Sequence, residues 1–92
     1  QDAQKYVSTT PEKFDVVIVD LYVGEQLPKF VYSPKFLSRI KTISPLAIFN
    51  HLFYDVNKRI KAGLLSDRAT TIFSKIQLIR ELTNLLIICS HD

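Results

Sequence analysis

The chain has 92 residues, of which 47% are hydrophobic and 11% aromatic. This length allows one small domain, and the composition is typical of a globular chain rather than a disordered one. The formal net charge is +3, but the twelve Lys and Arg residues are spread along the chain, which argues against a nucleic-acid groove.

The sequence shows no pattern typical of a membrane span, a signal peptide or a metal site. No apolar run approaches the ~20 residues of a membrane span, and the N-terminal segment lacks the apolar core of a signal peptide. A single cysteine, Cys89, rules out an internal disulfide and suits a reducing compartment. It lies in the apolar run LLIICS, where a buried thiol is more common than a nucleophile. We therefore expect a cytoplasmic protein, no membrane partner and, from the Cys, His and carboxylate spacing, no metal site.

The first elements in chain order are a short helix and a strand. Residues 4–10, QKYVSTT, have the pattern of a short helix ending in polar residues. Residues 14–22, FDVVIVDLY, form an apolar run of strand length, as in a parallel strand covered on both faces. Residues 23–32 contain Gly24 and Pro28 without a regular period, which predicts a loop of about ten residues.

A helix and a second strand come next. Residues 33–43, SPKFLSRIKTI, begin with a capping serine and a proline suited to the first helical position. Their apolar residues fall on one stripe of a helix. Residues 44–53, SPLAIFNHLF, then predict a strand that starts after Pro45. Two parallel strands linked by a helix form a right-handed unit.

The last part of the sequence, from residue 55 on, predicts a helical segment followed by a β-hairpin. Between positions 55 and 73 the apolar residues fit one helical face: Val56, Ile60, Leu64, Ile72 and Phe73. Gly63, with a candidate cap at Ser66 or Asp67, leaves open whether this is one helix or two. Residues 75–90 read as two strands joined by a tight turn near 82–84, so the last strand runs antiparallel to its neighbour.

Together these elements predict an α/β fold whose ligand site lies beyond the carboxyl ends of the strands. Asp20 ends the first strand and would lie at that edge of the sheet, beside the loop of residues 23–32. Asn50 and His51, near the end of the second strand, would face the same crevice.

Four stretches of the chain match a known family in order and spacing: DAQKYV, FDVVIVDLYVGEQLP, SPKFLSRIKTISPLAIFN and TNLLIICS. They resemble the C-terminal half of the S-adenosylmethionine (SAM)-dependent methyltransferase fold, most of all its spermidine synthase-like branch. The resemblance implies a Rossmann-like partial domain over residues 1–92, without the glycine-rich first half. It implies a methyl- or aminopropyltransferase, with SAM or decarboxylated SAM as the cofactor of the complete domain. This chain alone would bind the cofactor weakly or not at all and would be inactive.

The resemblance also implies roles for individual residues. Asp2 matches the acidic residue that accepts a hydrogen bond from the adenine amino group, with Ala3 beside it. Asp20 matches the carboxylate that positions or deprotonates an attacking amine, which is suitable chemistry for a neutral nucleophile. Leu21 and Tyr22 fall in the substrate loop.

Departures from the family pattern argue against aminopropyl transfer. Aminopropyltransferases commonly carry Asp-Ser/Thr-Ser/Thr-Asp-Pro at this strand end, whereas residues 21–24 here are Leu-Tyr-Val-Gly. The glycine pair expected before the second strand is replaced by Ile43 and Ser44. The two glycines of the chain, Gly24 and Gly63, lie in no G-x-G motif.

Three functions remain open from the sequence. The chain is a fragment of a SAM-dependent transferase acting on a small molecule, a non-catalytic module that self-associates through its sheet, or an independent α/β domain that binds another ligand near Asp20. A sheet without the strands of the first half would leave the VVIVD strand with an open apolar edge, so we expect a homo-oligomer.

Overall fold

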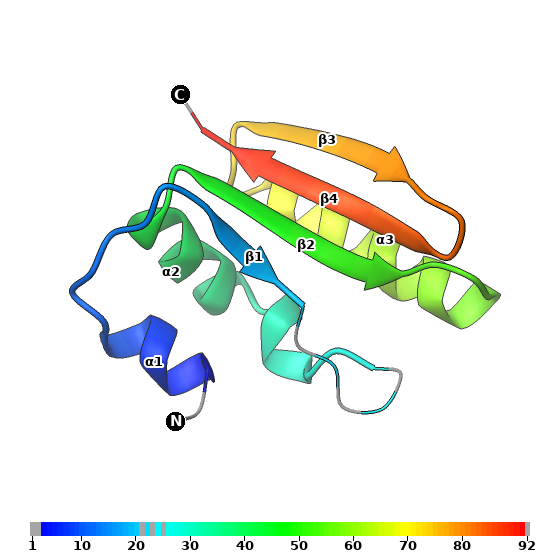
Figure 1. Cartoon of the computed structure of the whole chain (residues 1–92), viewed down its shortest axis with the longest axis horizontal. Helices are drawn as coiled ribbons and strands as arrows, with labels where there is room; N and C mark the ends of the chain where they lie inside the picture. Colours follow the sequence, from blue (N-terminus) through cyan, green and yellow to red (C-terminus); the bar gives the residue numbers. More distant parts are fainter. Residues whose placement is uncertain (1–2, 21, 23, 25, 92) are drawn as a thin grey trace.

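The computed structural model describes residues 3–20, 22, 24 and 26–91. Its four strands form one sheet in the order β1-β2-β4-β3, with bounds β1 (Val17–Val19), β2 (Leu46–Leu52), β3 (Lys75–Arg80) and β4 (Asn84–Ser90). β1 and β2 are parallel, whereas β4 runs antiparallel to both β2 and β3 (Figure 1). The predicted parallel pair and C-terminal hairpin are confirmed.

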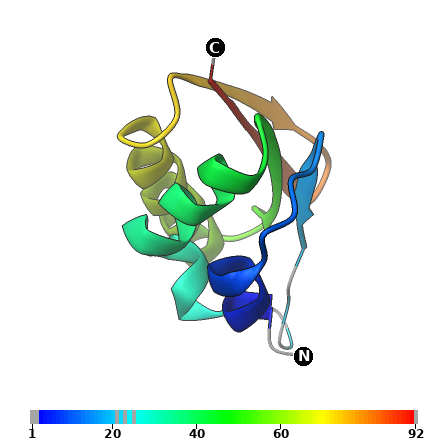
Figure 2. The same cartoon turned by 90° about the vertical axis from the view of Figure 1, so that its left-hand side faces the viewer.

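The helices all lie on one face of this sheet (Figure 2). They are α1 (Ala3–Thr9), the 3₁₀ helix η1 (Lys29–Tyr32), α2 (Pro34–Ile43) and α3 (Val56–Thr70). No helix in the described part of the chain is long and apolar enough to cross a membrane. The molecule therefore has two layers, a helical layer and a sheet whose second face no described helix covers.

Helix α2 begins and packs as its sequence predicts. The Ser33 hydroxyl accepts a hydrogen bond from the Phe36 backbone N–H at 3.1 Å, and Pro34 is the first helical residue. This cap satisfies one of the backbone donors that every helix start leaves unpaired. The four apolar residues of the predicted stripe are buried: Phe36, Leu37, Ile40 and Ile43.

The apolar face predicted for α3 is wrong. Val56, Ile60 and Leu64 are 68%, 65% and 41% exposed, whereas the buried positions of the helix are Ala62, Leu65 and Ala69. Alanines have little side-chain bulk, so they bring the helix backbone close to the sheet. Val56, Ile60 and Leu64 lie on roughly the opposite side of the helix from that contact line. Gly63 does not interrupt α3, which is a single helix capped by Asp55.

The burial predicted for the first strand is also wrong in part. Among the described residues of the predicted strand, Val17–Val19 pair in the sheet, and of these Val19 is 3% exposed while Ile18 is 66% exposed. Val16, just before the strand, is 41% exposed. Alternate residues of a strand point to opposite faces, and the described helices cover one face. The apolar run therefore reflects a strand with one side packed and the other open.

Candidate functional site

The carboxyl ends of β1 and β2 meet at one edge of the sheet because the two strands are parallel. Ligands of open α/β folds bind beyond such an edge. Asp20 follows β1 directly and is exposed there, as the sequence predicted for its position. Tyr22, two residues later, and the loop after β2 lie at the same edge.

Tyr22 ties the end of β1 to the end of β2. Its hydroxyl donates to the Asn50 carbonyl at 2.5 Å and accepts from the Leu52 backbone N–H at 2.8 Å. Burial raises the pKa of Tyr22, the Leu52 N–H opposes that rise, and the charge of Asp20 adds to it. The phenol is therefore a protonated structural bridge that fixes the chain after Asp20.

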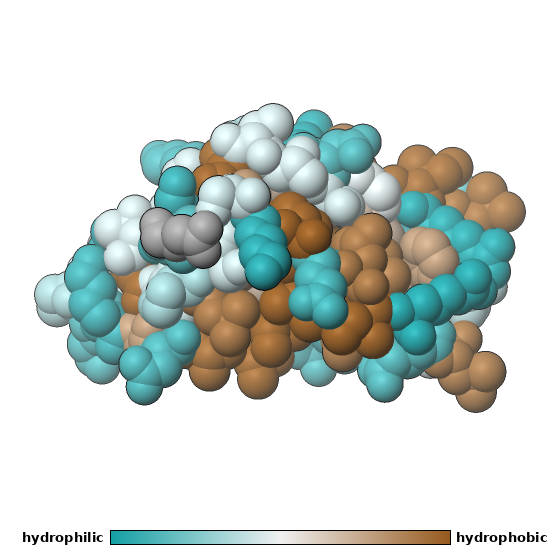
Figure 3. Space-filling model, turned by 90° about the horizontal axis from the view of Figure 1, so that it is seen from above, coloured by the Kyte–Doolittle hydropathy of each residue, from teal (hydrophilic) through white to brown (hydrophobic). Residues whose placement is uncertain are grey.

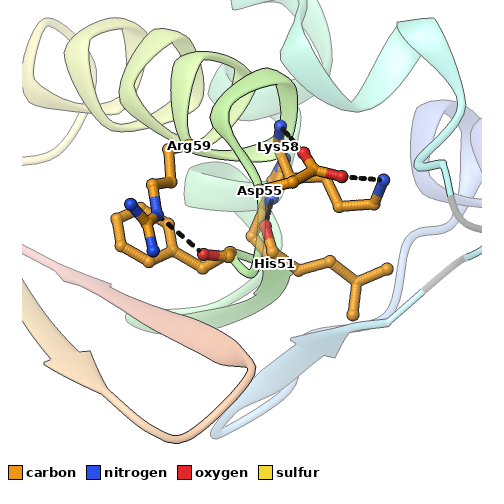
Figure 4. Close-up of polar contacts among 6 residues, drawn as sticks. His51, Asp55, Lys58 and Arg59 are labelled. Carbon is orange, nitrogen blue, oxygen red and sulfur yellow. Dashed lines mark hydrogen bonds and ion pairs between the residues drawn. The ribbon is translucent and has the colours of Figure 1, made fainter.

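His51 is buried in the helical layer at the end of β2. Its Nδ1 lies 2.7 Å from the Leu52 carbonyl, and its Nε2 lies 2.7 Å from the Tyr32 hydroxyl (Figure 4 shows the ring beside α3). A carbonyl can only accept, so Nδ1 donates and Nε2 accepts the Tyr32 proton. Burial lowers the pKa of His51, and the charges of Lys61 and Lys58 lower it further, against the hydrogen bond to Leu52. The ring is held neutral.

The loop between β2 and α3 is fixed by charged side chains (Figure 4). Asp55 accepts from the Lys58 backbone N–H at 2.8 Å and from the Lys58 Nζ at 3.1 Å. These contacts, the backbone N–H first, lower the pKa of Asp55. The Arg59 Nε donates to the Phe53 carbonyl at 3.1 Å. The start of α3 is thus held firmly against the end of β2.

A cavity of about 340 Å³ opens between this start of α3 and the loop after β1. Its lining residues are Tyr22, Gln26, Leu27, Tyr32, His51, Asn57, Lys58, Ile60 and Lys61. Tyr22 and His51 therefore share one cavity, whereas Asp20 lies outside its lining. Three of these residues, Asn57, Lys58 and Lys61, were not predicted from the sequence. They lie in the first turns of the helix that follows a strand, and residues at that place commonly line a ligand site in α/β folds.

A second cavity, about 260 Å³ and almost wholly apolar, lies along β1. It is lined by Ala3, Tyr6, Val7, Phe14, residues 16–19, Phe36, Ile40 and Ile43. Ala3 begins α1, which the Arg39 guanidinium holds by donating to the carbonyls of Val7 and Thr10 at 2.7 and 2.6 Å. The predicted cofactor residue Ala3 thus lies beside the strand that ends at Asp20.

The other residues predicted for the site are Asp2, Leu21 and Asn50. Asp2 and Leu21 lie outside the described residues. Asn50 does not face the crevice of His51: it points to the other face of the sheet, where its Oδ1 accepts from the Asn84 Nδ2 at 2.7 Å. Period-two alternation along β2 forces this separation of neighbouring residues. The described residues contain no cluster of three or more His, Cys, Asp or Glu side chains that could hold a metal ion.

Comparison by sequence finds no relative of this chain, whereas comparison by structure finds one. No family model and no curated protein matches the chain by sequence. Among solved structures, human methyltransferase-like protein 13 in complex with SAH matches with a TM-score of 0.78 and 18% identity. The chain has a methyltransferase-like fold. The match covers 100% of this chain and 47% of that one, so the chain spans about half the length of its structural neighbour.

Likeness at 18% identity establishes the fold alone, and neither a superfamily nor a branch of one. The expected Rossmann-like α/β architecture with a C-terminal antiparallel hairpin is therefore confirmed. The spermidine synthase-like assignment remains a prediction, as do the roles of Asp20, Ala3 and Tyr22.

Proposed function

We propose that this chain forms one wall of the active site of a SAM-dependent methyltransferase. The observation that carries the proposal is the fold match, over the whole chain, to a methyltransferase-like protein in complex with SAH. SAH is what SAM becomes once it has given up its methyl group. The exposed carboxylate of Asp20 at the carboxyl end of β1 supports the same location for the chemistry.

The described residues fit one end of SAM. The apolar cavity along β1 offers aliphatic side chains and Tyr6, which suits a flat adenine ring placed beside Ala3. It offers little polar surface for the amino-acid end, and the chain has no glycine-rich loop to bind that group. We propose that residues outside this sequence complete the cofactor site. When bound, SAM supplies an electrophilic methyl group.

Asp20 is the residue we assign to the methyl acceptor. An amine or hydroxyl must be neutral, or lose its proton, to attack a methyl group, and a carboxylate can accept that hydrogen bond and proton. The second acidic residue typical of aminopropyltransferases is missing from residues 21–24. Methyl transfer to a small-molecule substrate is therefore our proposal, rather than aminopropyl transfer. The cytoplasmic location belongs to the same proposal, because Cys89 is a free thiol without a disulfide partner, which suits a reducing compartment.

The test compares Asp20→Asn with Asp67→Asn in the longest natural protein that contains this sequence. Asp67 is an exposed carboxylate on α3, so its substitution removes the same charge away from the site. We expect Asp20→Asn to lower kcat by about 100-fold with an unchanged circular dichroism spectrum, and Asp67→Asn to leave turnover within about twofold. Radiolabelled SAM measures the transfer. Equal activity of the two variants would remove Asp20 from the mechanism.

Cofactor binding gives a separate test of the partial-domain proposal. Calorimetry should show no tight binding of SAM by the 92-residue chain and measurable binding by the longer protein. Tight binding by the 92 residues alone would show that they hold a complete cofactor site.

A second candidate function is supported by the edge strand β1. Among the described strands β1 pairs only with β2, and Ile18 on it is 66% exposed. An apolar edge of this kind pairs readily with another chain. We propose on this ground that the isolated chain is a homo-oligomer that associates through β1. Light scattering at micromolar concentration should give at least a dimer, and Ile18→Lys should dissociate it; a monomeric parent chain would contradict this.

A further inference from the structure

A groove runs along α3 on its side facing η1. It consists of the 340 Å³ cavity described above and a neighbouring cavity of about 300 Å³. The two share four lining residues: Gln26, Leu27, Tyr32 and Lys61. The first reaches Lys58 near the start of α3 and the second reaches Arg68 near its end, a span of about 15 Å at 1.5 Å per residue. We call this feature the α3 groove.

The α3 groove is positively charged. Its lining includes Lys29, Lys58, Lys61 and Arg68 but no described Asp or Glu. In the described part of the chain the only ion pair is Lys58 with Asp55, so the other three cations lack a carboxylate partner. The Arg68 guanidinium donates to the Tyr32 carbonyl at 3.0 Å, which holds one cation in place at the end of the groove. Basic residues that are spread along the sequence are thus brought together in the fold as a local cluster of positive charge.

Apolar side chains lie between these cations. Ile60 is 65% exposed and Leu64 is 41% exposed, and their i, i+4 spacing places them next to each other on α3. Leu27 lines both cavities from the opposite side. Ile60 and Leu64 were predicted to lie on the apolar face of this helix, and their exposure beside the groove provides apolar contact area for a ligand.

The aromatic rings of the groove are not free to stack on nucleic-acid bases. Tyr32 is 8% exposed and its hydroxyl donates to His51. Tyr22 is half-buried and its hydroxyl bridges two backbone groups. Single-stranded nucleic acids need open aromatic rings in addition to cations. The combination of cations with aliphatic side chains favours a peptide instead.

We propose that the α3 groove binds a short acidic protein segment with interspersed apolar residues. Its carboxylates pair with Lys29, Lys61 and Arg68, and its apolar side chains pack on Ile60 and Leu64. A length of about 15 Å accommodates about five extended residues at 3.3 Å each. This interaction goes beyond methyl transfer and does not depend on SAM, because none of the residues that line the α3 groove lines the apolar cavity along β1.

The test measures fluorescence anisotropy of a labelled octapeptide that alternates glutamate with leucine and serine, in the absence of SAM. The comparison peptide has glutamine in place of glutamate. The groove variant is Lys29→Glu with Lys61→Glu, and the matched control is Lys5→Glu with Lys75→Glu, which changes the net charge equally at exposed positions on α1 and β3. Circular dichroism verifies that both variants are folded.

We expect the acidic peptide to bind at least about tenfold more tightly than the glutamine peptide, with an affinity that falls as salt rises. The groove variant should weaken binding by about tenfold or more and the control by less than about twofold. Equal weakening in both variants, or no binding at about 1 mM chain, would overturn the proposal. Tighter binding of an oligothymidylate, lost in the groove variant, would overturn it in favour of a nucleic-acid site.

Discussion

Ile87 and Ile88 are neighbours on β4 with opposite environments. Ile87 points into the helical layer and is 0% exposed, whereas Ile88 is half-buried on the face that no described helix covers. The same contrast holds on β2, where Ala47, Phe49 and His51 are buried and their neighbours in sequence are not. Figure 3, viewed from the β3 side, shows apolar side chains (brown) reaching the surface among polar ones. Side-chain type alone therefore does not separate the covered face from the open one.

The open face is apolar along a line across three strands. Ile18, Ile48 and Ile88 are aligned by the register of β1 with β2 and of β2 with β4. A sheet covered on one side normally alternates apolar and polar residues. We call this row of three isoleucines the isoleucine face. An apolar row of this kind is instead typical of a surface that another layer covers, which agrees with a chain spanning about half of its structural neighbour's length.

The largest expected effect is on the covered face. Phe49→Ala removes a 0% exposed ring at the centre of the core and should lower the free energy of unfolding by about 3–5 kcal/mol. Ile79→Ala, on the open side of β3 and 41% exposed, is the control and should cost under about 1 kcal/mol. Urea denaturation followed by circular dichroism measures both. Similar losses for the two would contradict the two-layer description.

The Tyr22 bridge joins the two strand ends at the candidate site. Tyr22→Phe leaves the Leu52 N–H and the Asn50 carbonyl without their partner and should cost about 1–2 kcal/mol. Tyr54→Phe is the matched control, because Tyr54 is 42% exposed and its ring contact with Lys58 survives the substitution. The control should lie within about 0.5 kcal/mol of the parent chain. Equal effects would show that the bridge contributes nothing.

His51 should make stability fall in mild acid. Its folded-state pKa is lowered, so below the unfolded value near 6.5 the unfolded chain binds more protons and the free energy of unfolding decreases. The slope for one proton is at most about 1.4 kcal/mol per pH unit. Denaturation midpoints between about pH 7.5 and pH 5.5 measure it, and His51→Gln should flatten the curve. An unchanged slope in that variant would assign the pH dependence to other groups.

These cases show how far the sequence could predict the molecule. The helix of residues 34–43 was predictable because its cap, its proline and its stripe are local signals. The face of α3 was not, since contact with the sheet selected Ala62 and Ala69 over larger apolar residues. Asp20 was placed correctly at the strand end, but the 340 Å³ cavity combines four residues of the following segment, Tyr22, Gln26, Leu27 and Tyr32, with the start of α3. Long-range contacts of this kind leave no local pattern in the chain.

The smallest expected effect is the stability cost of Ile88→Thr, which tests whether the open face of the sheet is covered in the functional protein. Ile87→Thr and Ile88→Thr make the same change at adjacent positions and keep a β-branched residue, so strand propensity is matched. In the 92-residue chain Ile87→Thr should cost about 2–3 kcal/mol, since it puts a hydroxyl in the core, and Ile88→Thr about 0.5 kcal/mol. In the longest natural protein containing the sequence, a covering layer raises the cost of Ile88→Thr toward that of Ile87→Thr. The cost of Ile88→Thr stays about 2 kcal/mol below that of Ile87→Thr in the longer protein only if no layer covers Ile88, because burying the added hydroxyl lowers stability. That outcome would show that the isoleucine face is a solvent-exposed surface.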